Sequence, residues 1–281
     1  MIYLAKITPR RYDDRLGVLF FGAMMASVIL FNKPYGVHSQ FRKEFATMAT
    51  LADFFDDKSL RVAGRLDKDS EGLLILTNHG GLNHAITTPP NAKNTNQRSQ
   101  KHSKTYLVQV ENLPTDEQLQ MLRQGVLLKD GMTLPAKVEH ILEQDLPIKL
   151  WERNPPIRQR ANIPTAWLKI SIMEGRNRQV RRMVATVGLP CLRLIRFQVG
   201  DWTLANLAVG ESCRLYLSDE QLLALGVNPC DDKRHIGQKK SAPYQDKITE
   251  QSKAYTNKSS TTLQKRQGSR VIRYKKSNAK M

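Results

Sequence analysis

Apolar and polar residues alternate or cluster in blocks that predict short strands interspersed with helices. The apolar, β-branched run at residues 27–32 predicts a buried strand, and the run at 73–76 predicts another. Residues 104–111 and 166–173 alternate between apolar and polar side chains, which is typical of strands with one buried face. The Asp-Gly pair at 130–131 lies between two apolar runs and indicates a hairpin turn.

Helices are predicted after Thr115 and after Ser218, because a glutamine follows each of them three residues later in the capping-box pattern. Gly125 and Gly226 are placed to end these two helices. Apolar residues at helical spacing predict a third helix at residues 45–55. Strands and helices are mixed without a regular βαβ alternation, so the sequence favours an α+β fold over a doubly wound sheet.

An apolar run at residues 16–31 follows three arginines and so imitates a signal peptide. The run is too short for a comfortable membrane span, and it continues without a cleavage-like break into a strand and turn at 32–36. Met24 or Met25 is an alternative start of the chain. We therefore expect a cytoplasmic protein that does not associate with a membrane.

Charge indicates the kind of partner. The 281-residue chain carries 44 lysines and arginines against 26 acidic residues, a formal net charge of +18. Residues 229–281 hold 14 basic and 4 acidic side chains, and the rest of the chain is also basic, at +8. A polyanion is the expected partner of both parts. Three cysteines without a C-x-x-C spacing argue against a disulfide scaffold and a zinc knuckle.

Two basic segments have little apolar surface to bury. Residues 89–103 are polar, with three basic side chains and no acid, and predict a flexible loop. Residues 229–281 lack apolar patterning and are expected to be disordered. This tail is interpreted either as a solubilising extension or as an arm that tethers RNA.

The densest polar block is G-R-L-D-K-D-S-E-G at residues 64–72, directly before an apolar strand. In an extended chain Arg65 and Asp67 point to one side and Leu66 to the other. The block is open to several interpretations: a charged surface loop whose aspartates cap backbone amides, a D-x-D metal site, or a functional carboxylate near an arginine cluster.

That cluster begins with E-G-R-N-R-Q-V-R-R-M at residues 174–183, which opens a predicted helix ending before Gly188. Arg178, Arg181 and Arg182 share one face of this helix. Residues 174–196 include six arginines and one acidic residue. Unless this is merely a solvated basic face, the guanidinium groups need phosphates or a buried carboxylate among them.

Other signals are weaker. Tyr106 places an aromatic ring on the strand after the basic loop, where it either packs in the sheet or stacks on a base. The sequence contains no P-loop, G-x-G-x-x-G or H-E-x-x-H motif. Nucleotide cofactors and metals are thus not indicated.

Five segments, in this order, resemble the RsuA-type pseudouridine synthases, and most of all their large-subunit rRNA branch, RluE. They are V-I-L-F-N-K-P-Y-G (28–36), G-R-L-D-K-D-S-E-G-L-L-I-L-T-N (64–78), K-T-Y-L-V-Q-V (104–110), E-G-R-N-R-Q-V-R-R-M (174–183) and L-R-L-I-R (192–196). The second and fourth segments are jointly very specific. The resemblance covers residues 27–217, and too few residues precede it for the RNA-binding S4 domain of many relatives.

The resemblance implies an α+β pseudouridine synthase fold, with a mixed, mostly antiparallel sheet, flanking helices and a central cleft. It implies an isomerase that detaches a uracil base from its ribose at N1 and rejoins it through C5, without a cofactor or metal. The expected partner is 23S rRNA, free or in the assembling large ribosomal subunit, and the expected state is a monomer. The expected domains are an N-terminal extension (1–26), a catalytic domain (27–228) and a basic tail (229–281).

The family motif falls on Asp67 as the catalytic residue, which either attacks the nucleoside or removes a ribose 2′ proton. It places Arg181 in an ion pair that keeps the desolvated Asp67 carboxylate charged. Tyr106 matches the residue that stacks on the target base, and Leu194 matches an apolar wall of the pocket. Arg65 is expected to hold the RNA and help flip the nucleotide. We assign contacts with the flanking RNA strand to Arg176, Arg178, Arg182, Arg193 and Arg196.

Two rival functions make different predictions. A non-catalytic RNA-binding or ribosome-assembly protein with the same fold would keep its function in the Asp67→Asn variant. A metal-dependent nucleic-acid enzyme that uses Asp67 and Asp69 would lose activity with a chelator.

Overall fold

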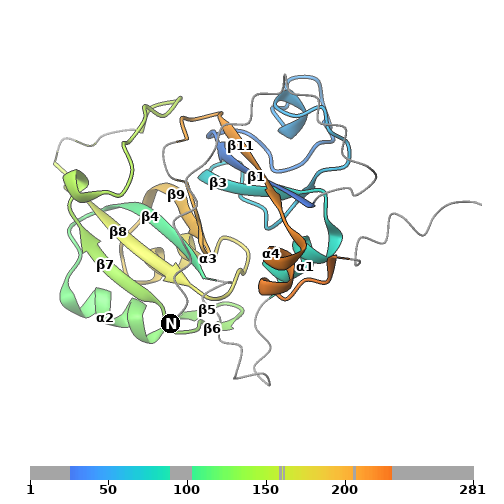
Figure 1. The fold of residues 1–281 in the computed structure, drawn as a ribbon. Coiled ribbons are helices and arrows are strands. Elements are labelled where there is room, and N and C mark those ends of the chain that lie inside the picture. Colours follow the sequence, from blue (N-terminus) through green and yellow to red (C-terminus); the bar gives the residue numbers. More distant parts are fainter. Residues whose placement is uncertain (1–25, 89–102, 158–159, 161, 205–206, 230–281) are drawn as a thin grey trace, which may run out of the picture. The chain divides into compact units, whose positions relative to one another are not determined.

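The computed structural model describes residues 26–88, 103–157, 160, 162–204 and 207–229 (Figure 1). The predicted N-terminal extension lies outside these residues, apart from Ala26, and so do nearly all of the basic loop and of the tail. None of the helices within the described ranges is both long and apolar enough to cross a lipid bilayer.

Short helices separate the strands along the chain. The strands are β1 (Ala26–Lys33), β2 (Arg61–Val62), β3 (Glu71–Thr77), β4 (Lys104–Glu111), β5 (Leu127–Leu128), β6 (Gly131–Met132), β7 (Lys137–Ile141), β8 (Thr165–Ile172), β9 (Cys191–Val199), β10 (Trp202–Thr203) and β11 (Ser212–Leu217). The α-helices are α1 (Gly80–Thr87), α2 (Asp116–Gln124), α3 (Gln179–Thr186) and α4 (Asp219–Ala224), and the 3-10 helices are η1 (Leu51–Asp53) and η4 (Glu143–Asp145).

Nine of the described strands form one mixed sheet in the order β11-β1-β3-β9-β4-β8-β7, with β2 beside β3 and β10 beside β9 (Figure 1). Among these pairings only that of β3 with β9 is parallel, with Glu71 opposite Ile195 and Gly72 opposite Arg196. We call this short parallel pairing the seam, because it joins two antiparallel parts of the sheet. The prediction of an α+β fold with a mixed, mostly antiparallel sheet is confirmed.

Gly72 allows close approach at the seam. Its φ is +96°, and a Cβ atom at this position would lie 2.5 Å from the carbonyl oxygen of Arg196. The backbone conformation and the short contact both require a residue without a side chain. The glycine that ends the G-R-L-D block is therefore needed where β3 meets β9.

Alternating side chains of the strands contribute to two apolar clusters, one on each face of the sheet. In β3, Leu74 joins the first cluster and its neighbour Leu73 joins the second. Leu122 of α2 and Met183 of α3 pack in the first cluster, and Leu82 of α1 packs in the second. Helix α4 also covers the second cluster, and Figure 1 shows it beside α1.

The predicted capping boxes are confirmed. Thr115 accepts a hydrogen bond from the amide of Gln118 at the start of α2, and Ser218 accepts one from the amide of Gln221 at the start of α4. Gly125 ends α2 with φ +100°. Each of these signals depends on a few neighbouring residues, which is why the sequence reveals them.

The helix predicted at residues 45–55 is wrong. This segment forms turns and the short η1, which begins after Thr50. Phe45 is 58% exposed, so the apolar spacing does not describe one buried face. Helix α1, in contrast, was not predicted. His79 caps its first turn, because the imidazole ring accepts a hydrogen bond from the amide of Leu82.

Candidate active site

Asp67 lies on the loop between β2 and β3, and hydrogen bonds fix the backbone of this loop on both sides of it. Before Asp67, the carbonyl of Leu66 accepts from the Ser39 hydroxyl at 2.7 Å, and its amide donates back at 3.2 Å. After Asp67, the carbonyl of Lys68 accepts from the amide of Gly36 at 2.7 Å. The turn that follows β1 therefore holds the loop that carries Asp67.

The Asp67 carboxylate is half-exposed, which differs from the expectation of a desolvated carboxylate. Its side chain is 39% exposed, while the neighbouring Leu66 is buried in the core. Arg65, on the other side of Leu66, is exposed. The predicted alternation of Arg65, Leu66 and Asp67 along the loop thus agrees with their exposure.

Arg178 is the cation that faces Asp67. Its Nη1 lies 3.5 Å from Asp67 Oδ2, and the same guanidinium donates to Asp69 at 2.9 and 2.7 Å. Burial opposes ionisation of Asp69, but the hydrogen bonds from Arg178 and the charge of Arg181 outweigh it and lower its pKa. The D-x-D pair is bridged by a guanidinium, and the described residues include no group of three or more His, Cys, Asp or Glu that could hold a metal ion.

The ion pair between Arg181 and Asp67 is not formed. Arg181 Nη2 instead donates to the backbone carbonyl of Asp69 at 2.6 Å, and Nη1 donates to the sulfur of Cys191 at 3.4 Å. Arg178 precedes α3, whereas Arg181 is the third residue of its first turn, so the two side chains reach different parts of the loop. Burial raises the pKa of the Cys191 thiol to about 11, which keeps it neutral.

Tyr106 and Leu194 are buried in the apolar cluster that also contains Leu66. They lie on adjacent strands, β4 and β9, and Tyr106 is the partner of Arg196 in that pairing. The structure therefore places both predicted base-contacting residues in the core on which the Asp67 loop rests.

Arg193 and Arg196 lie inside the protein, which contradicts the prediction that they contact RNA. Arg193 makes two 2.9 Å hydrogen bonds to Glu71 across the seam, and these side chains are 6% and 1% exposed. The guanidinium of Arg196 is buried and donates to the carbonyls of Leu73 and Gly64 at 2.8 and 2.9 Å. These arginines hold the parts of the sheet together, and Glu71 is a buried carboxylate of the kind that the arginine cluster required.

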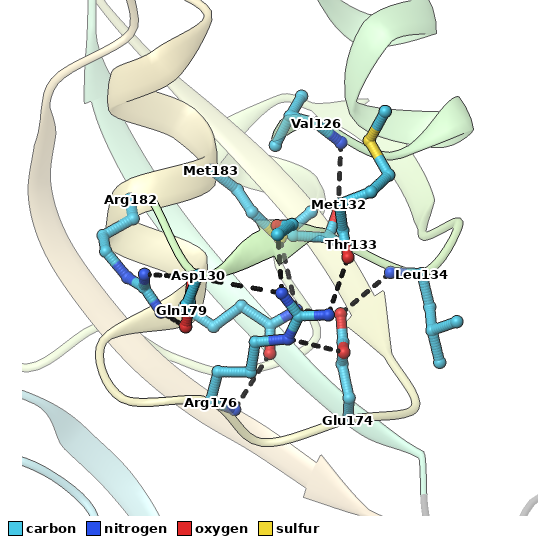
Figure 2. Close-up of polar contacts among 11 residues, drawn as sticks. Val126, Asp130, Met132, Thr133, Leu134, Glu174, Arg176, Gln179, Arg182 and Met183 are labelled. Carbon is cyan, nitrogen blue, oxygen red and sulfur yellow. Dashed lines mark hydrogen bonds and ion pairs between the residues drawn. The ribbon is translucent and has the colours of Figure 1, made fainter. Parts of the chain in front are cut away.

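Arg176 and Arg182 bind the β5–β6 hairpin, as Figure 2 shows. Arg176 donates to two backbone carbonyls of this hairpin at 2.7 and 3.0 Å and to Glu174 at 3.0 Å. Arg182 donates to both carboxylate oxygens of Asp130 at 2.7 and 3.1 Å. Many of their donors are thus used within the protein, and RNA contact by these two residues stays a prediction.

Lys33 is a buried residue near the site that the sequence analysis missed. Its ammonium donates to the carbonyls of Pro34 at 2.9 Å and Val37 at 2.8 Å, in the turn that holds the Asp67 loop. Burial lowers its pKa to about 7, although the charge of Glu71 opposes this shift. The signal available in the sequence was a lysine that continues an apolar strand up to a proline.

The fold and this site match a known protein family. The family described as RNA pseudouridylate synthase matches residues 27–186. The chain belongs to this family, and it is therefore an isomerase that forms pseudouridine in RNA.

Individual relatives agree with this assignment. Ribosomal large subunit pseudouridine synthase E of Vibrio parahaemolyticus serotype O3:K6 (strain RIMD 2210633) is 54% identical over 184 residues, which cover 66% of this chain and 71% of the relative. The protein of the same name from Xanthomonas axonopodis pv. citri (strain 306) is 51% identical, covering 64% of this chain and 90% of its own. A crystal structure of a pseudouridylate synthase, 29% identical, has a TM-score of 0.52 and covers 71% of this chain and 74% of that chain. The resemblance found in the sequence is confirmed.

Proposed function

We propose that this chain converts a specific uridine of 23S rRNA to pseudouridine, as a cytoplasmic monomer with residues 27–228 as its catalytic domain. The relatives at 51% and 54% identity are named as synthases of the large ribosomal subunit, which supports this substrate. The observation that carries the proposal is the Asp67 carboxylate: half-exposed, on a loop fixed from both sides, and faced by a guanidinium.

Asp67 is the catalytic residue of this proposal. An ionised carboxylate at a fixed position serves equally for attack on the nucleoside and for removal of the ribose 2′ proton. The guanidinium of Arg178 lies 3.5 Å from one carboxylate oxygen of Asp67 and leaves the carboxylate half-exposed. Its exposure leaves access for a nucleotide that has left its helix, and the bound RNA then excludes water from the site.

The other predicted site residues take supporting roles. Tyr106 and Leu194 are assigned contact with the target base because the family motif falls on them; they lie in the same cluster as Leu66, the neighbour of Asp67, and are buried in the unbound protein. The exposed Arg65 holds the RNA next to Asp67. Around the N-terminal end of α3 the chain supplies positive charge for the phosphate backbone. The residues that supply it are Arg176, Arg178, Arg181 and Arg182.

The test uses rRNA labelled with tritium at uracil C5, because that hydrogen is released when the new carbon–carbon bond forms. We expect Asp67→Ala to abolish tritium release and to leave RNA binding in place, since the carboxylate does the chemistry. Asp57→Ala is the matched control, because Asp57 is also an aspartate paired with an arginine, Arg214, at 3.4 Å. This control should keep the wild-type rate.

Turnover by the Asp67→Ala variant would refute the assignment. A chelator should leave the wild-type rate unchanged, whereas an enzyme that used Asp67 and Asp69 to bind a metal would lose activity. If the wild-type protein binds rRNA but releases no tritium, the non-catalytic alternative is correct.

A further inference from the structure

Asp69 lies two residues after Asp67 and shares the same arginine. Arg178 Nη1 is 2.9 Å from Asp69 Oδ1 and 3.5 Å from Asp67 Oδ2, while Nη2 is 2.7 Å from Asp69 Oδ2. The guanidinium thus binds Asp69 through two short hydrogen bonds and Asp67 through one long contact. Because a bidentate pair fixes the plane of a guanidinium, Asp69 determines how Nη1 faces Asp67.

Asp69 is itself held by a second arginine. Its backbone carbonyl accepts from Arg181 Nη2 at 2.6 Å, and Arg181 Nε, a buried donor without a hydrogen-bond partner, faces its carboxylate at 3.6 Å. Side-chain exposure rises from 13% for Arg181 and 26% for Asp69 to 39% for Asp67 and 43% for Arg178. The more buried pair therefore anchors the more exposed one.

The backbone of Arg178 supports this arrangement. Its φ is +47°, in the left-handed region that residues with a side chain seldom adopt. Such a conformation persists when the surrounding contacts require it. The bidentate pair with Asp69 is a contact of this kind, and it directs the side chain toward the loop, ahead of the first turn of α3.

We propose that Asp69 is a positioning residue, which holds Arg178 beside Asp67 and prevents it from binding both oxygens of the catalytic carboxylate. This inference rests on the proposed function of Asp67. Without the charge of Asp69, Arg178 closes on Asp67 in the bidentate geometry that guanidinium prefers, and the reacting oxygen is blocked. Arg178 then serves the reaction through Asp67, in addition to the positive charge that it supplies at this end of α3.

The experiment measures the single-turnover rate of tritium release from labelled rRNA with enzyme in excess, and RNA affinity separately. We expect Asp69→Asn to lower the rate on the order of 100-fold, because misplacement of a reacting group by about 1 Å costs this much. RNA binding should not weaken, because the substitution removes a negative charge. Asp69→Glu should recover part of the rate, because it restores a carboxylate for Arg178.

A double variant tests whether Asp69 acts through Arg178. Arg178→Lys should also slow the reaction, and adding Asp69→Asn to it should cause no further loss, because both changes disrupt one contact. Asp57→Asn, which removes a comparable aspartate–arginine pair, is the control and should keep the wild-type rate. Thermal unfolding of each variant confirms that it is folded.

The outcomes separate this inference from the proposed function. A wild-type rate in Asp69→Asn, or a loss explained by weaker RNA binding alone, overturns the positioning role while Asp67→Ala remains inactive. If Asp69→Asn does not fold, Arg178→Lys decides, since it changes an exposed side chain, and a wild-type rate there also overturns the inference. If the wild-type protein itself releases no tritium, the proposed function fails and the inference fails with it.

Discussion

Asp67 and Glu71 are carboxylates four residues apart in one segment, yet each meets an arginine in a different environment. Glu71 is 1% exposed, makes two 2.9 Å hydrogen bonds with Arg193, and accepts a third bond from Trp151 at 2.8 Å. Asp67 is 39% exposed and has one 3.5 Å contact with Arg178. We call the first the closed pair and the second the open pair.

The difference separates structure from chemistry. In the closed pair both carboxylate oxygens and two nitrogens of the guanidinium bind each other inside the protein, so the pair joins β3 to β9. In the open pair the Arg178 guanidinium is bound mainly by Asp69, and the Asp67 carboxylate stays accessible. A carboxylate that must react needs an incomplete set of partners, whereas one that must hold a sheet together needs a complete set.

The largest expected effect is on the closed pair. Glu71→Gln leaves Arg193 as a buried charge without its counterion, and we expect the free energy of unfolding to fall by about 3–5 kcal/mol. Asp67→Asn should change it by less than about 1 kcal/mol, because exposed ion pairs contribute little. Urea unfolding of both variants measures the contrast.

A second variant checks the cause of that loss. In Glu71→Gln combined with Arg193→Met, the guanidinium that lost its counterion is also removed, so much of the lost stability should return. Equal destabilisation by Glu71→Gln and Asp67→Asn would show that the distinction between closed and open pairs is wrong.

The sequence predicts features that depend on neighbouring residues. Thr115 and Gln118 cap α2 through an interaction across three positions, and the alternation at 104–111 predicts β4 with its bounds. The predicted helix at 45–55 fails for the complementary reason: apolar spacing is informative only where the apolar residues share a buried face, and the exposed Phe45 does not.

The partners of the arginines could not be predicted in the same way. Arg193 lies 122 positions from Glu71, and Arg178 lies 109 positions from Asp69, so only the folded chain brings these partners together. The family motif indicated that Asp67 needs an arginine, but Arg181, the residue it matched, binds the backbone of Asp69 instead. A motif identifies the residue types of a site more reliably than it identifies their contacts.

The next effect concerns pH and the buried Lys33. Its pKa is lowered to about 7 by burial, with Glu71, Asp69 and Asp67 opposing this and Arg196 adding to it. Above pH 7 the folded protein releases this proton while the unfolded chain keeps it up to about pH 10.5. Below pH 7 the folded protein therefore bears the full free-energy cost of burying the charged ammonium. This cost decreases, and the free energy of unfolding increases, as the pH rises from 7 toward 10.5.

We compare the wild-type protein with Lys33→Met, which lacks this titration. The stability of the wild type relative to the variant should increase by roughly 1 kcal/mol per pH unit between about pH 7 and 10. Urea unfolding at four pH values gives the slope. If the difference in stability between wild type and Lys33→Met does not vary with pH, Lys33 stays charged in the folded protein. The interior around the closed pair then tolerates an additional cation.

The smallest expected effect is on the hairpin contact between Asp130 and Arg182, which has the exposure of the open pair but short hydrogen bonds. Asp130→Asn should change the stability little, because both side chains are in contact with water. It releases Arg182 for a phosphate, so the slope of log affinity against log salt should steepen by about 0.7–0.9.

Asp57→Asn is the control for this change, since it raises the net charge equally and releases Arg214, on the edge strand β11, away from α3. If both variants steepen the salt dependence alike, the effect is due to total charge and Arg182 makes no specific contact with RNA. If only Asp130→Asn does so, the region around the N-terminal end of α3 binds the phosphate backbone. If instead Asp130→Asn unfolds the protein, the hairpin contact belongs with the closed pair despite its exposure, and exposure alone does not distinguish structural from functional ion pairs.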